Sequence, residues 1–214
     1  MKSTFLYLIL LSVFLLDLLF VWNDSNEPRF FTKTLLLPLL IVIYLVVSQQ
    51  NSVRQQPRIS KTFLAGLIFS FFGDLFLLFN WGFLPGLGSF LLAHVFYILC
   101  FSKLRKKTPP VFSTMAVAVY LVALIVFLFP HLDEMKIPVI IYGSVISVMF
   151  WFSISTGQKL LVFGALLFVV SDTVLAVNIF VNQHVALSLI VMITYVAAQF
   201  LLVRGMLKAN QKNT

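Results

Sequence analysis

The chain has 214 residues, of which 61% are hydrophobic and only 10% are charged, and its formal net charge is +8. Soluble domains carry about 25% charged residues, so this composition excludes an ordinary soluble protein and indicates an integral membrane protein. The basic residues lie beside apolar runs, where anionic lipid head groups attract them. The positive charge therefore indicates contact with a membrane surface and not with nucleic acid.

The apolar runs predict the secondary structure directly. A hydrocarbon core about 30 Å thick needs about 20 apolar residues for each helical crossing. Runs of this length occur eight times, near residues 4–22, 30–48, 62–80, 86–102, 111–129, 137–154, 159–181 and 185–205. The connections are too short for a soluble domain, so we expect an all-α bundle of eight transmembrane helices, with residues 1–214 forming a single transmembrane domain.

The first run follows Lys2 and could be mistaken for a secretory signal. A signal has a shorter apolar core, about 7 to 15 residues, followed by small residues at a cleavage site. This run ends in Phe20, Val21 and Trp22 instead. We therefore interpret it as the first membrane-spanning helix.

Basic residues are distributed unequally between alternate connections, and lysine and arginine near the ends of spans are retained in the cytoplasm. Arg29, Lys33 and Lys136 lie on one side, together with Asp24, Glu27, Asp133 and Glu134. The remaining twelve lie on the other side: Lys2, Arg54, Arg58, Lys61, Lys103, Arg105, Lys106, Lys107, Lys159, Arg204, Lys208 and Lys212. This asymmetry predicts that both termini are cytoplasmic, as an even number of spans requires.

Several kinds of site are not indicated by the sequence. Cys100 is the single cysteine, so neither a disulfide framework nor a thiolate metal site is expected. The motifs H-E-x-x-H, G-x-x-x-x-G-K-[ST] and G-x-S-x-G do not occur. We expect no metal and no cofactor.

The ionisable residues inside the predicted spans are the candidates for chemistry. They are Asp17, Asp74, His94 and Asp172, with Lys33 near the outer end of the second span. A charged side chain at the middle of a membrane costs about 2.5 to 3.5 kcal/mol on insertion scales, so such residues usually face a polar interior. Each could alternatively form only a hydrogen bond between helices, and for Asp17 we favour that interpretation.

An internal repeat links two of these aspartates. Residues 66–80, GLIFSFFGDLFLLFN, align without gaps with residues 164–178, GALLFVVSDTVLAVN. At this constant offset of 98 residues, Gly66 matches Gly164, Asp74 matches Asp172, Asn80 matches Asn178 and Tyr97 matches Tyr195. The pattern predicts a tandem four-helix repeat whose halves are related by an axis along the membrane normal.

The repeat places the two carboxyl groups at one depth. Asp74 and Asp172 each lie thirteen residues beyond the basic residue that opens the helix, Lys61 or Lys159, which is roughly 20 Å of helix. Two carboxyl groups that share a nonpolar cavity tend to hold one proton between them, so an acid and a base are present together. His94, Tyr195 and Gln199 could reach the same level, and Lys33 could extend toward its outer half.

Five segments resemble the blocks of a known family. They are FTKTLLLP (31–38), GLIFSFFGD (66–74), AHVFY (93–97), GALLFVVSDTVLA (164–176) and ITYVAAQ (193–199). In this order, from about residue 31 to 202, the chain resembles the YhhN-like family, the lysoplasmalogenases. In one departure from the family's pattern, Thr34 follows Lys33 where a proline is common, and the proline of this chain is Pro38.

The resemblance implies an eight-helix membrane enzyme that hydrolyses the vinyl ether of lysoplasmenyl-choline or lysoplasmenyl-ethanolamine. The products would be a fatty aldehyde and glycerophosphocholine or glycerophosphoethanolamine, the substrate would be a lysophospholipid, and the surroundings would be membrane lipids. The functional residues that it implies are Lys33, Asp74, His94, Asp172, Tyr195 and Gln199.

Vinyl ether hydrolysis needs a proton donor, an anion that stabilises a cation, and a base for water. Two carboxyl groups can supply all three, as they do in glycoside hydrolysis. Our hypothesis is that one of Asp74 and Asp172 donates the proton while the other stays ionised, and the residues leave open which is which. His94, Tyr195 and Gln199 would position water or the head group, and Lys33 would meet its phosphate.

Two other functions remain open at this point. A di-aspartyl intramembrane protease also needs two carboxyl groups at one depth, but such proteases carry G-x-G-D, whereas Phe71 and Phe72 precede Gly73 here. A proton-coupled transporter of small molecules would use the aspartates as a relay and would account for the repeat. Its helices often break at the substrate site, yet the third and seventh runs contain no proline. In each case we expect a multi-pass membrane protein, in the inner membrane if the source is bacterial.

Overall fold

The computed structural model describes residues 2–50 and 59–212, and within them the secondary structure is entirely helical. Its eight α-helices confirm the all-α prediction. They are α1 (Lys2–Trp22), α2 (Asn26–Gln50), α3 (Lys61–Phe76), α4 (Phe83–Lys103), α5 (Val111–Leu128), α6 (Lys136–Ser155), α7 (Lys159–Phe180) and α8 (Val185–Lys212). The short 3₁₀ turns η1 (Phe129–His131) and η2 (Asp133–Met135) connect α5 to α6.

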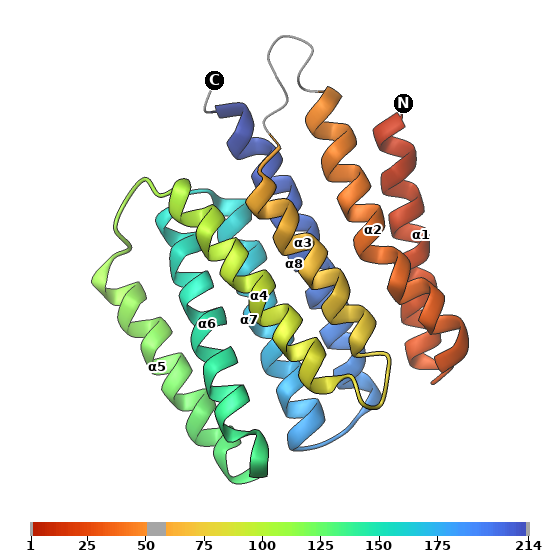
Figure 1. The fold of residues 1–214 in the computed structure, drawn as a ribbon, viewed down its shortest axis with the longest axis vertical. Coiled ribbons are helices and arrows are strands. Elements are labelled where there is room, and N and C mark those ends of the chain that lie inside the picture. The colour runs from red at the N-terminus through yellow and green to blue at the C-terminus, as the bar shows by residue number, and fades with distance from the viewer. Residues whose placement is uncertain (1, 51–58, 213–214) are drawn as a thin grey trace.

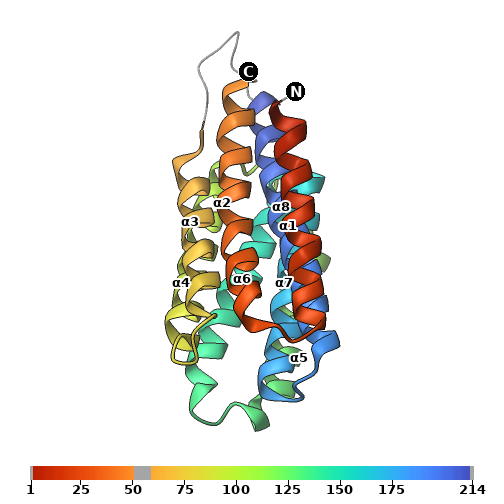
Figure 2. The same cartoon turned by 90° about the vertical axis from the view of Figure 1, so that its right-hand side faces the viewer.

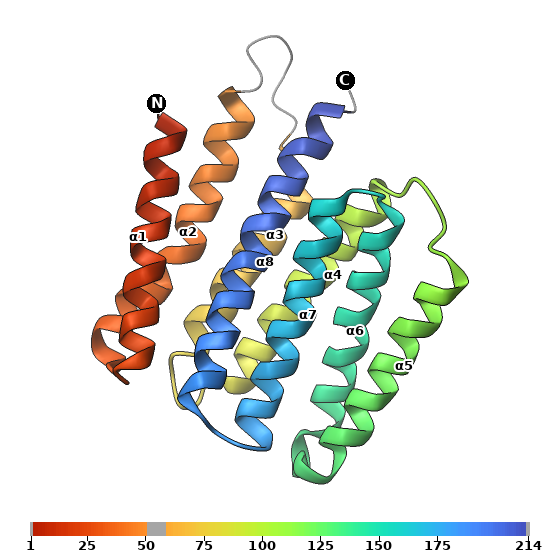
Figure 3. The same cartoon turned by 180° about the vertical axis from the view of Figure 1, so that it is seen from behind.

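The helices form a flat bundle with α1 and α5 at its opposite edges (Figure 1). Seen edge on, α3 and α4 lie on one face, and α7 and α8 lie on the other (Figure 2). The view from behind shows α7 and α8 side by side in the middle of the bundle (Figure 3). The most extensive helix contacts are those of α7 with α8 and of α3 with α4.

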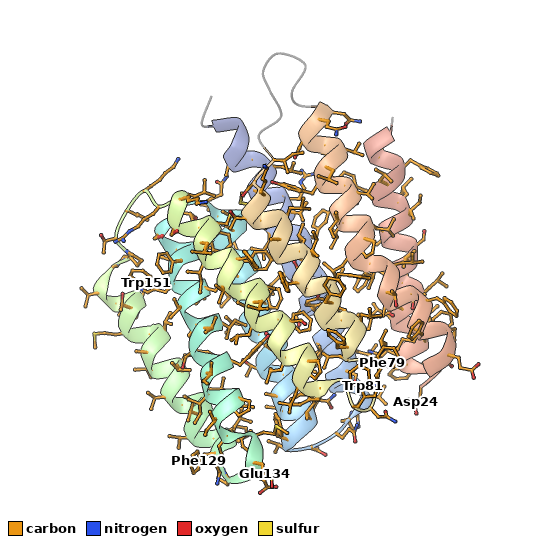
Figure 4. The ribbon with its side chains drawn as sticks, in the orientation of Figure 1. Asp24, Phe79, Trp81, Phe129, Glu134 and Trp151 are labelled. Atoms are coloured by element: carbon orange, nitrogen blue, oxygen red, sulfur yellow. The ribbon has the colours of Figure 1, made fainter. Side chains whose placement is uncertain are left out.

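Two ends of the bundle differ in charge. The basic end contains the ends of the described chain, the connection that follows α4 and the start of α7 (Figure 1). The far end contains the connections 23–25, 77–82, 129–135 and 181–184. Asp24, Trp81 and Glu134 are labelled at the far end in Figure 4, whereas Trp151 lies toward the basic end. Arg54 and Arg58, which contribute to the predicted charge asymmetry, lie outside the described residues.

The outer surface is apolar, as a bilayer requires. On α5, only Leu128 is buried, and Phe112 is 83% exposed. In the part of the chain that the structure describes, seven helices are long and apolar enough to cross a membrane, namely all but α3. The protein is therefore a multi-pass membrane protein.

Helix α3 is shorter than predicted. Its start at Lys61 is fixed by Ser60, whose hydroxyl accepts a hydrogen bond from the backbone N–H of Phe63 at 3.2 Å. Its end at Phe76 comes four residues before the predicted end of the run at residue 80. A series of turns follows, in which the backbone N–H groups of Leu78 and Phe79 bond to carbonyls three residues earlier. Asp74 consequently lies in the last turn of α3 and not in the middle of a long span.

The glycines of the sequence repeat lie at close helix contacts. A Cβ atom on Gly66 would lie 2.4 Å from the ring of Tyr97, so the absence of a side chain allows α3 to approach α4. A Cβ atom on Gly164 would lie 2.9 Å from the side chain and 3.0 Å from the backbone nitrogen of Leu202, so it has the same effect between α7 and α8. Each glycine thus brings together one of the two most extensive helix pairs.

Candidate active site

Both aspartates of the repeat line one pocket between α2, α3, α7 and α8, close to the far end of the bundle. The pocket encloses about 70 Å³, which is room for a few water molecules. Its polar lining residues are Arg29, Lys33, Asp74, Ser171, Asp172, Asn178, Ser188 and Tyr195. We call it the polar pocket. Of the six residues predicted for the site, it brings together Lys33, Asp74, Asp172 and Tyr195.

Asp74 is buried, with 4% of its surface exposed. One of its carboxyl oxygens accepts a hydrogen bond from the hydroxyl of Tyr195 on α8 at 2.7 Å. The cations of α2, Lys33 and Arg29, interact electrostatically with the same carboxyl group. Asp74 therefore has both a hydrogen-bond donor and nearby positive charge.

Asp172 on α7 has a different set of neighbours. One of its carboxyl oxygens accepts a hydrogen bond from the hydroxyl of Tyr142 on α6 at 2.5 Å. It also interacts electrostatically with Asp74 across the polar pocket. Two carboxyl groups placed in this way favour a state in which one of them is protonated.

A second pocket begins at Asp172 and is almost wholly apolar. Side chains of α4, α6 and α7 line it, among them Phe83, Leu87, Val139 and Ile179. It shares Leu77, Phe90, Asp172 and Leu175 with the polar pocket, so the two pockets meet at Asp172. Ile179 is 44% exposed, so this apolar pocket reaches the lipid-facing surface.

Lys33 lies one turn after Arg29 on α2, and only 9% of its surface is exposed. Thr34 stands where a proline was expected from the resemblance, and its hydroxyl donates to the carbonyl of Phe30 within the helix. The threonine at this position does not prevent Lys33 from reaching the site, because the lysine lines the polar pocket.

His94 and Gln199 do not line the polar pocket. The His94 ring is fully buried and packs edge-to-face against Phe168 and Tyr142, with ring centroids 4.7 and 5.4 Å apart. Among the described residues its nitrogens have no hydrogen-bond partner of good geometry, although the Phe90 carbonyl lies one turn earlier on α4. His94 thus packs against Tyr142, the residue that bonds to Asp172.

Gln199 lies deeper in the bundle, toward the basic end. Its side-chain oxygen accepts a hydrogen bond from Tyr97 at 3.0 Å, and the Tyr97 hydroxyl is also 3.3 Å from that of Ser70. This group connects α3, α4 and α8 on the basic-end side of Tyr195. Gln199 is therefore placed to support Tyr195 from one turn away on the same helix.

Asp17 is not part of the polar pocket. Its carboxylate accepts a hydrogen bond from Thr32 on α2 at 2.8 Å, and the side chain is fully buried. The predicted role of Asp17 in joining neighbouring helices is confirmed.

The chain was also compared with families of known proteins. Residues 28–206, most of the chain, match the YhhN family. The chain belongs to the YhhN family. The resemblance read from five short segments is thereby confirmed.

Relatives of this YhhN-family chain include named proteins from mammals and bacteria. The mouse protein named lysoplasmalogenase TMEM86B (Mus musculus) is 36% identical over 154 residues, which cover 70% of this chain and 66% of the relative. The human protein of that name (Homo sapiens) is 31% identical over 67% of this chain and 62% of its own length. A lysoplasmalogenase of Mycobacterium tuberculosis is 31% identical over 59% of this chain and 51% of its own length.

The matches therefore span less than two thirds of the length of these relatives. No solved structure matches the chain.

Two pocket residues of this YhhN-family chain were not predicted from the sequence. Tyr142 lies in a predicted span that contains no ionisable residue besides tyrosine, so nothing distinguished it from a packing residue. Arg29 was counted only as a charge at the end of a span. A periodic analysis of α2 could have found it, because Arg29 and Lys33 are four residues apart and share a helix face.

The described residues contain no group of three or more histidine, cysteine or acidic side chains that could hold a metal ion. The side chains that line the polar pocket supply carboxyl, hydroxyl, carboxamide, ammonium and guanidinium groups.

Proposed function

We propose that this protein hydrolyses the vinyl ether bond of lysoplasmalogens, releasing a fatty aldehyde and glycerophosphocholine or glycerophosphoethanolamine. The observation that carries the proposal is the pair of carboxyl groups, Asp74 and Asp172, on one small polar pocket inside a bundle of the YhhN family. The names of the mouse, human and mycobacterial relatives support the substrate class.

The apolar pocket would receive the hydrocarbon chain of the lipid. It starts at Asp172, reaches the lipid-facing surface near Ile179, and offers apolar side chains along its length. A lysoplasmalogen whose chain lies there has its vinyl ether where the apolar and polar pockets meet. The glycerol would then lie in the polar pocket, and the phosphate would lie at the end of the pocket where Arg29 is half-buried.

This orientation assigns different roles to the two aspartates. Asp172 borders both pockets, so it would face the vinyl carbon that carries the hydrocarbon chain, the β-carbon that must be protonated. One of its oxygens accepts from Tyr142, and the other is free to hold the proton. Asp74 borders the polar pocket but not the apolar one. In the polar pocket, Lys33 and Arg29 favour its ionised form. Asp172 is therefore the proton donor, and Asp74 is the carboxylate.

The reaction then balances with these two groups and water. The electrons of the double bond take the proton of Asp172 and form a new C–H bond at the β-carbon. Ionised Asp74 stabilises the resulting oxocarbenium ion. Water bonds to the adjacent carbon and gives a proton to Asp74. The hemiacetal collapses as its hydroxyl proton passes to Asp172, its bond to the glycerol oxygen breaks, and Asp74 returns a proton to that oxygen. Both carboxyl groups are then back in their starting states.

The other residues around the two pockets would act on this pair. Tyr195 and Tyr142 orient the carboxyl groups through their hydrogen bonds, and Gln199 and His94 support these tyrosines from behind. Lys33 lies beside Asp74 and would face the phosphate side of the substrate. No metal or cofactor takes part in the proposed reaction.

The membrane arrangement belongs to the same proposal. We propose a single transmembrane domain in which α3 also crosses the bilayer, which gives eight crossings and places both termini in the cytoplasm. The basic residues at the end of the bundle where the described chain begins and ends support this orientation. The matching positions of Gly66 and Gly164 support a tandem repeat. In a bacterial source the membrane would be the inner membrane.

The test is an assay of the purified protein in detergent micelles with lysoplasmenylcholine, in which free aldehyde is measured. Vinyl ether hydrolysis should be rapid, whereas the alkyl-ether and acyl counterparts should be stable, because neither forms an oxocarbenium ion on protonation of a carbon. Absence of aldehyde release would contradict the proposal, and uptake of a solute by proteoliposomes in its place would indicate a transporter.

A further inference from the structure

Two cations of α2, Arg29 and Lys33, face the polar pocket without an acceptor of their own. Nε of Arg29 is buried and has no hydrogen-bond partner among the described residues. Within the same ranges of the chain, neither side chain forms a hydrogen bond or an ion pair, although Lys33 is nine-tenths buried. A buried donor without an acceptor, such as Nε of Arg29, is unfavourable, so this part of the pocket is suited to an anionic ligand rich in oxygen.

The nearest acidic groups do not satisfy these donors. Asp74 accepts from Tyr195, and Asp17 accepts from Thr32. Asp17 acts on both cations electrostatically from α1 but does not line the pocket. The N–H groups of Arg29 and Lys33 are therefore left for a ligand. A guanidinium beside an ammonium is a favoured combination for phosphate, because the guanidinium binds two oxygens with fixed geometry.

The position of the pair fits the proposed orientation of the substrate. Arg29, in the first turn of α2, is half-buried at the far end of the pocket, and Asn178 and Ser188 complete the polar lining there. Lys33 lies one turn deeper, beside Asp74. With the vinyl ether at Asp172, only the glycerol carbons separate it from the phosphate. The phosphate would consequently lie at the end of the pocket that carries both cations.

We propose that Arg29 and Lys33 form a binding site for the phosphodiester of the lipid head group. This inference rests on the proposed function, since it takes the lysophospholipid as the ligand. It adds Arg29 as a residue that determines specificity: the site selects lipids with a phosphate next to the glycerol and holds the vinyl ether in register with the aspartates.

The kinetic test compares two substrates that share the vinyl ether. One is lysoplasmenylcholine, and the other is the 1-alkenylglycerol that lacks the phosphate. In Arg29→Gln, kcat/KM for the phospholipid should fall about 10- to 100-fold, mainly through KM, because a hydrogen-bonded charge pair is lost. The value for the alkenylglycerol should fall much less, because that substrate loses only the effect of the Arg29 charge on Asp74, and Arg29→Lys should recover part of the loss. Arg105→Gln, at the basic end, is the matched control and should behave as the unaltered protein.

The kinetic outcomes separate phosphate binding from a structural role. An equal loss on both substrates would show that Arg29 acts through the fold or through its charge near Asp74 and not through the phosphate, and this result would overturn the inference. An unchanged kcat/KM for the phospholipid would overturn it too. A loss at least about 10-fold larger for the phospholipid than for the alkenylglycerol would support it.

A binding test keeps the inference separate from catalysis. Glycerophosphocholine should raise the thermal unfolding temperature of the full-length protein in micelles, and this stabilisation should be lost in Arg29→Gln but kept in Arg105→Gln. This pattern supports the phosphate site even if no vinyl ether is hydrolysed, in which case the proposed function alone fails. Stabilisation by inorganic phosphate but not by glycerophosphocholine would overturn the assignment to a lipid phosphodiester.

Discussion

The pairs α3–α4 and α7–α8 have matching sequences but different surroundings at their aspartates. In both pairs a glycine, Gly66 or Gly164, lets the helices approach closely. The partners of the aspartates are not equivalent, however. Tyr195 of one pair bonds to Asp74 of the other, whereas its counterpart Tyr97 bonds to Gln199 and leaves Asp172 to Tyr142 of α6.

This difference shows how similar helix pairs can supply two chemically distinct carboxyl groups. Packing positions serve the same purpose in both pairs, because at Gly66 and at Gly164 the absence of a side chain lets the neighbouring helix approach. The neighbours of the carboxyl groups differ, because α2 brings cations to Asp74 while α4 and α6 bring apolar side chains to Asp172. Acid and base roles can then be divided between residues that correspond in sequence.

The largest expected effect comes from neutralising the aspartates. Asp172→Asn should lower kcat about 10³- to 10⁴-fold, because it removes the proton donor, and Asp74→Asn about 10²- to 10³-fold, because water can still attack a reactive cation. Aldehyde release in micelles measures both. Asp133→Asn is the control, since it makes the same change at an exposed position between α5 and α6 and should have little effect. A larger loss in Asp74→Asn would reverse the assigned roles.

The tyrosines distinguish the two carboxyl groups further. Tyr142→Phe and Tyr195→Phe should each lower kcat roughly 10-fold with little change in KM, since each removes one hydrogen bond to a carboxyl group. Tyr142→Phe alone should increase the solvent deuterium isotope effect on kcat, because only its partner transfers a proton to carbon. Equal isotope effects in the two variants would mean that the carboxyl groups share the proton donation.

The equivalence of the two glycines can be tested through stability. Gly66→Ala and Gly164→Ala should each destabilise the protein by about 1 to 3 kcal/mol, because the added methyl group would overlap Tyr97 or Leu202. Thermal unfolding in micelles measures the loss. Gly88→Ala is the matched control on α4, where a Cβ atom would meet nothing within 4 Å, and it should not destabilise. Tolerance of alanine at Gly66 or Gly164 would contradict the packing argument.

The smallest effect is expected at a hydrogen bond next to Asp172 that has no counterpart next to Asp74. Tyr120 of α5 and Thr173, the residue after Asp172, share a hydrogen bond, whereas the corresponding residue after Asp74 is Leu75. Tyr120→Phe should lower stability by about 0.6 kcal/mol, the average for such bonds between membrane helices, and should leave turnover unchanged. A large loss of turnover would show that α5 takes part in positioning Asp172.

The sequence was sufficient to predict the helices and the central pair of residues. Apolar run length determines where a helix crosses a bilayer, and the cost of burying charge marked Asp74, Asp172 and Lys33 as residues that face a polar interior. The end of α3 was misplaced because Leu77, Leu78 and Phe79 continue the apolar run after the helix has ended. Hydropathy registers apolar character and not backbone conformation.

The surroundings of the pocket could not be predicted in this way. Tyr142 and Arg29 meet the aspartates through the packing of α6 on α7 and of α2 on α3, and periodicity within one helix carries no information on that packing. His94 was predicted from its cost of burial and from the family resemblance, and the structure packs it against the aromatic rings of Tyr142 and Phe168, outside the polar pocket. Polar residues inside a membrane protein thus indicate a site, while their individual roles depend on tertiary contacts.

The early end of α3 has a consequence for the supply of water. Its 16 residues extend about 24 Å, less than the hydrocarbon thickness of about 30 Å. If α3 crosses the bilayer as proposed, the turns that follow lie near the membrane surface, and we expect the bilayer to thin and admit solvent on that side of the bundle. Water would then reach Asp74 from the adjacent aqueous phase. The glycerophosphocholine or glycerophosphoethanolamine could leave by the same route, while the aldehyde stays in the leaflet.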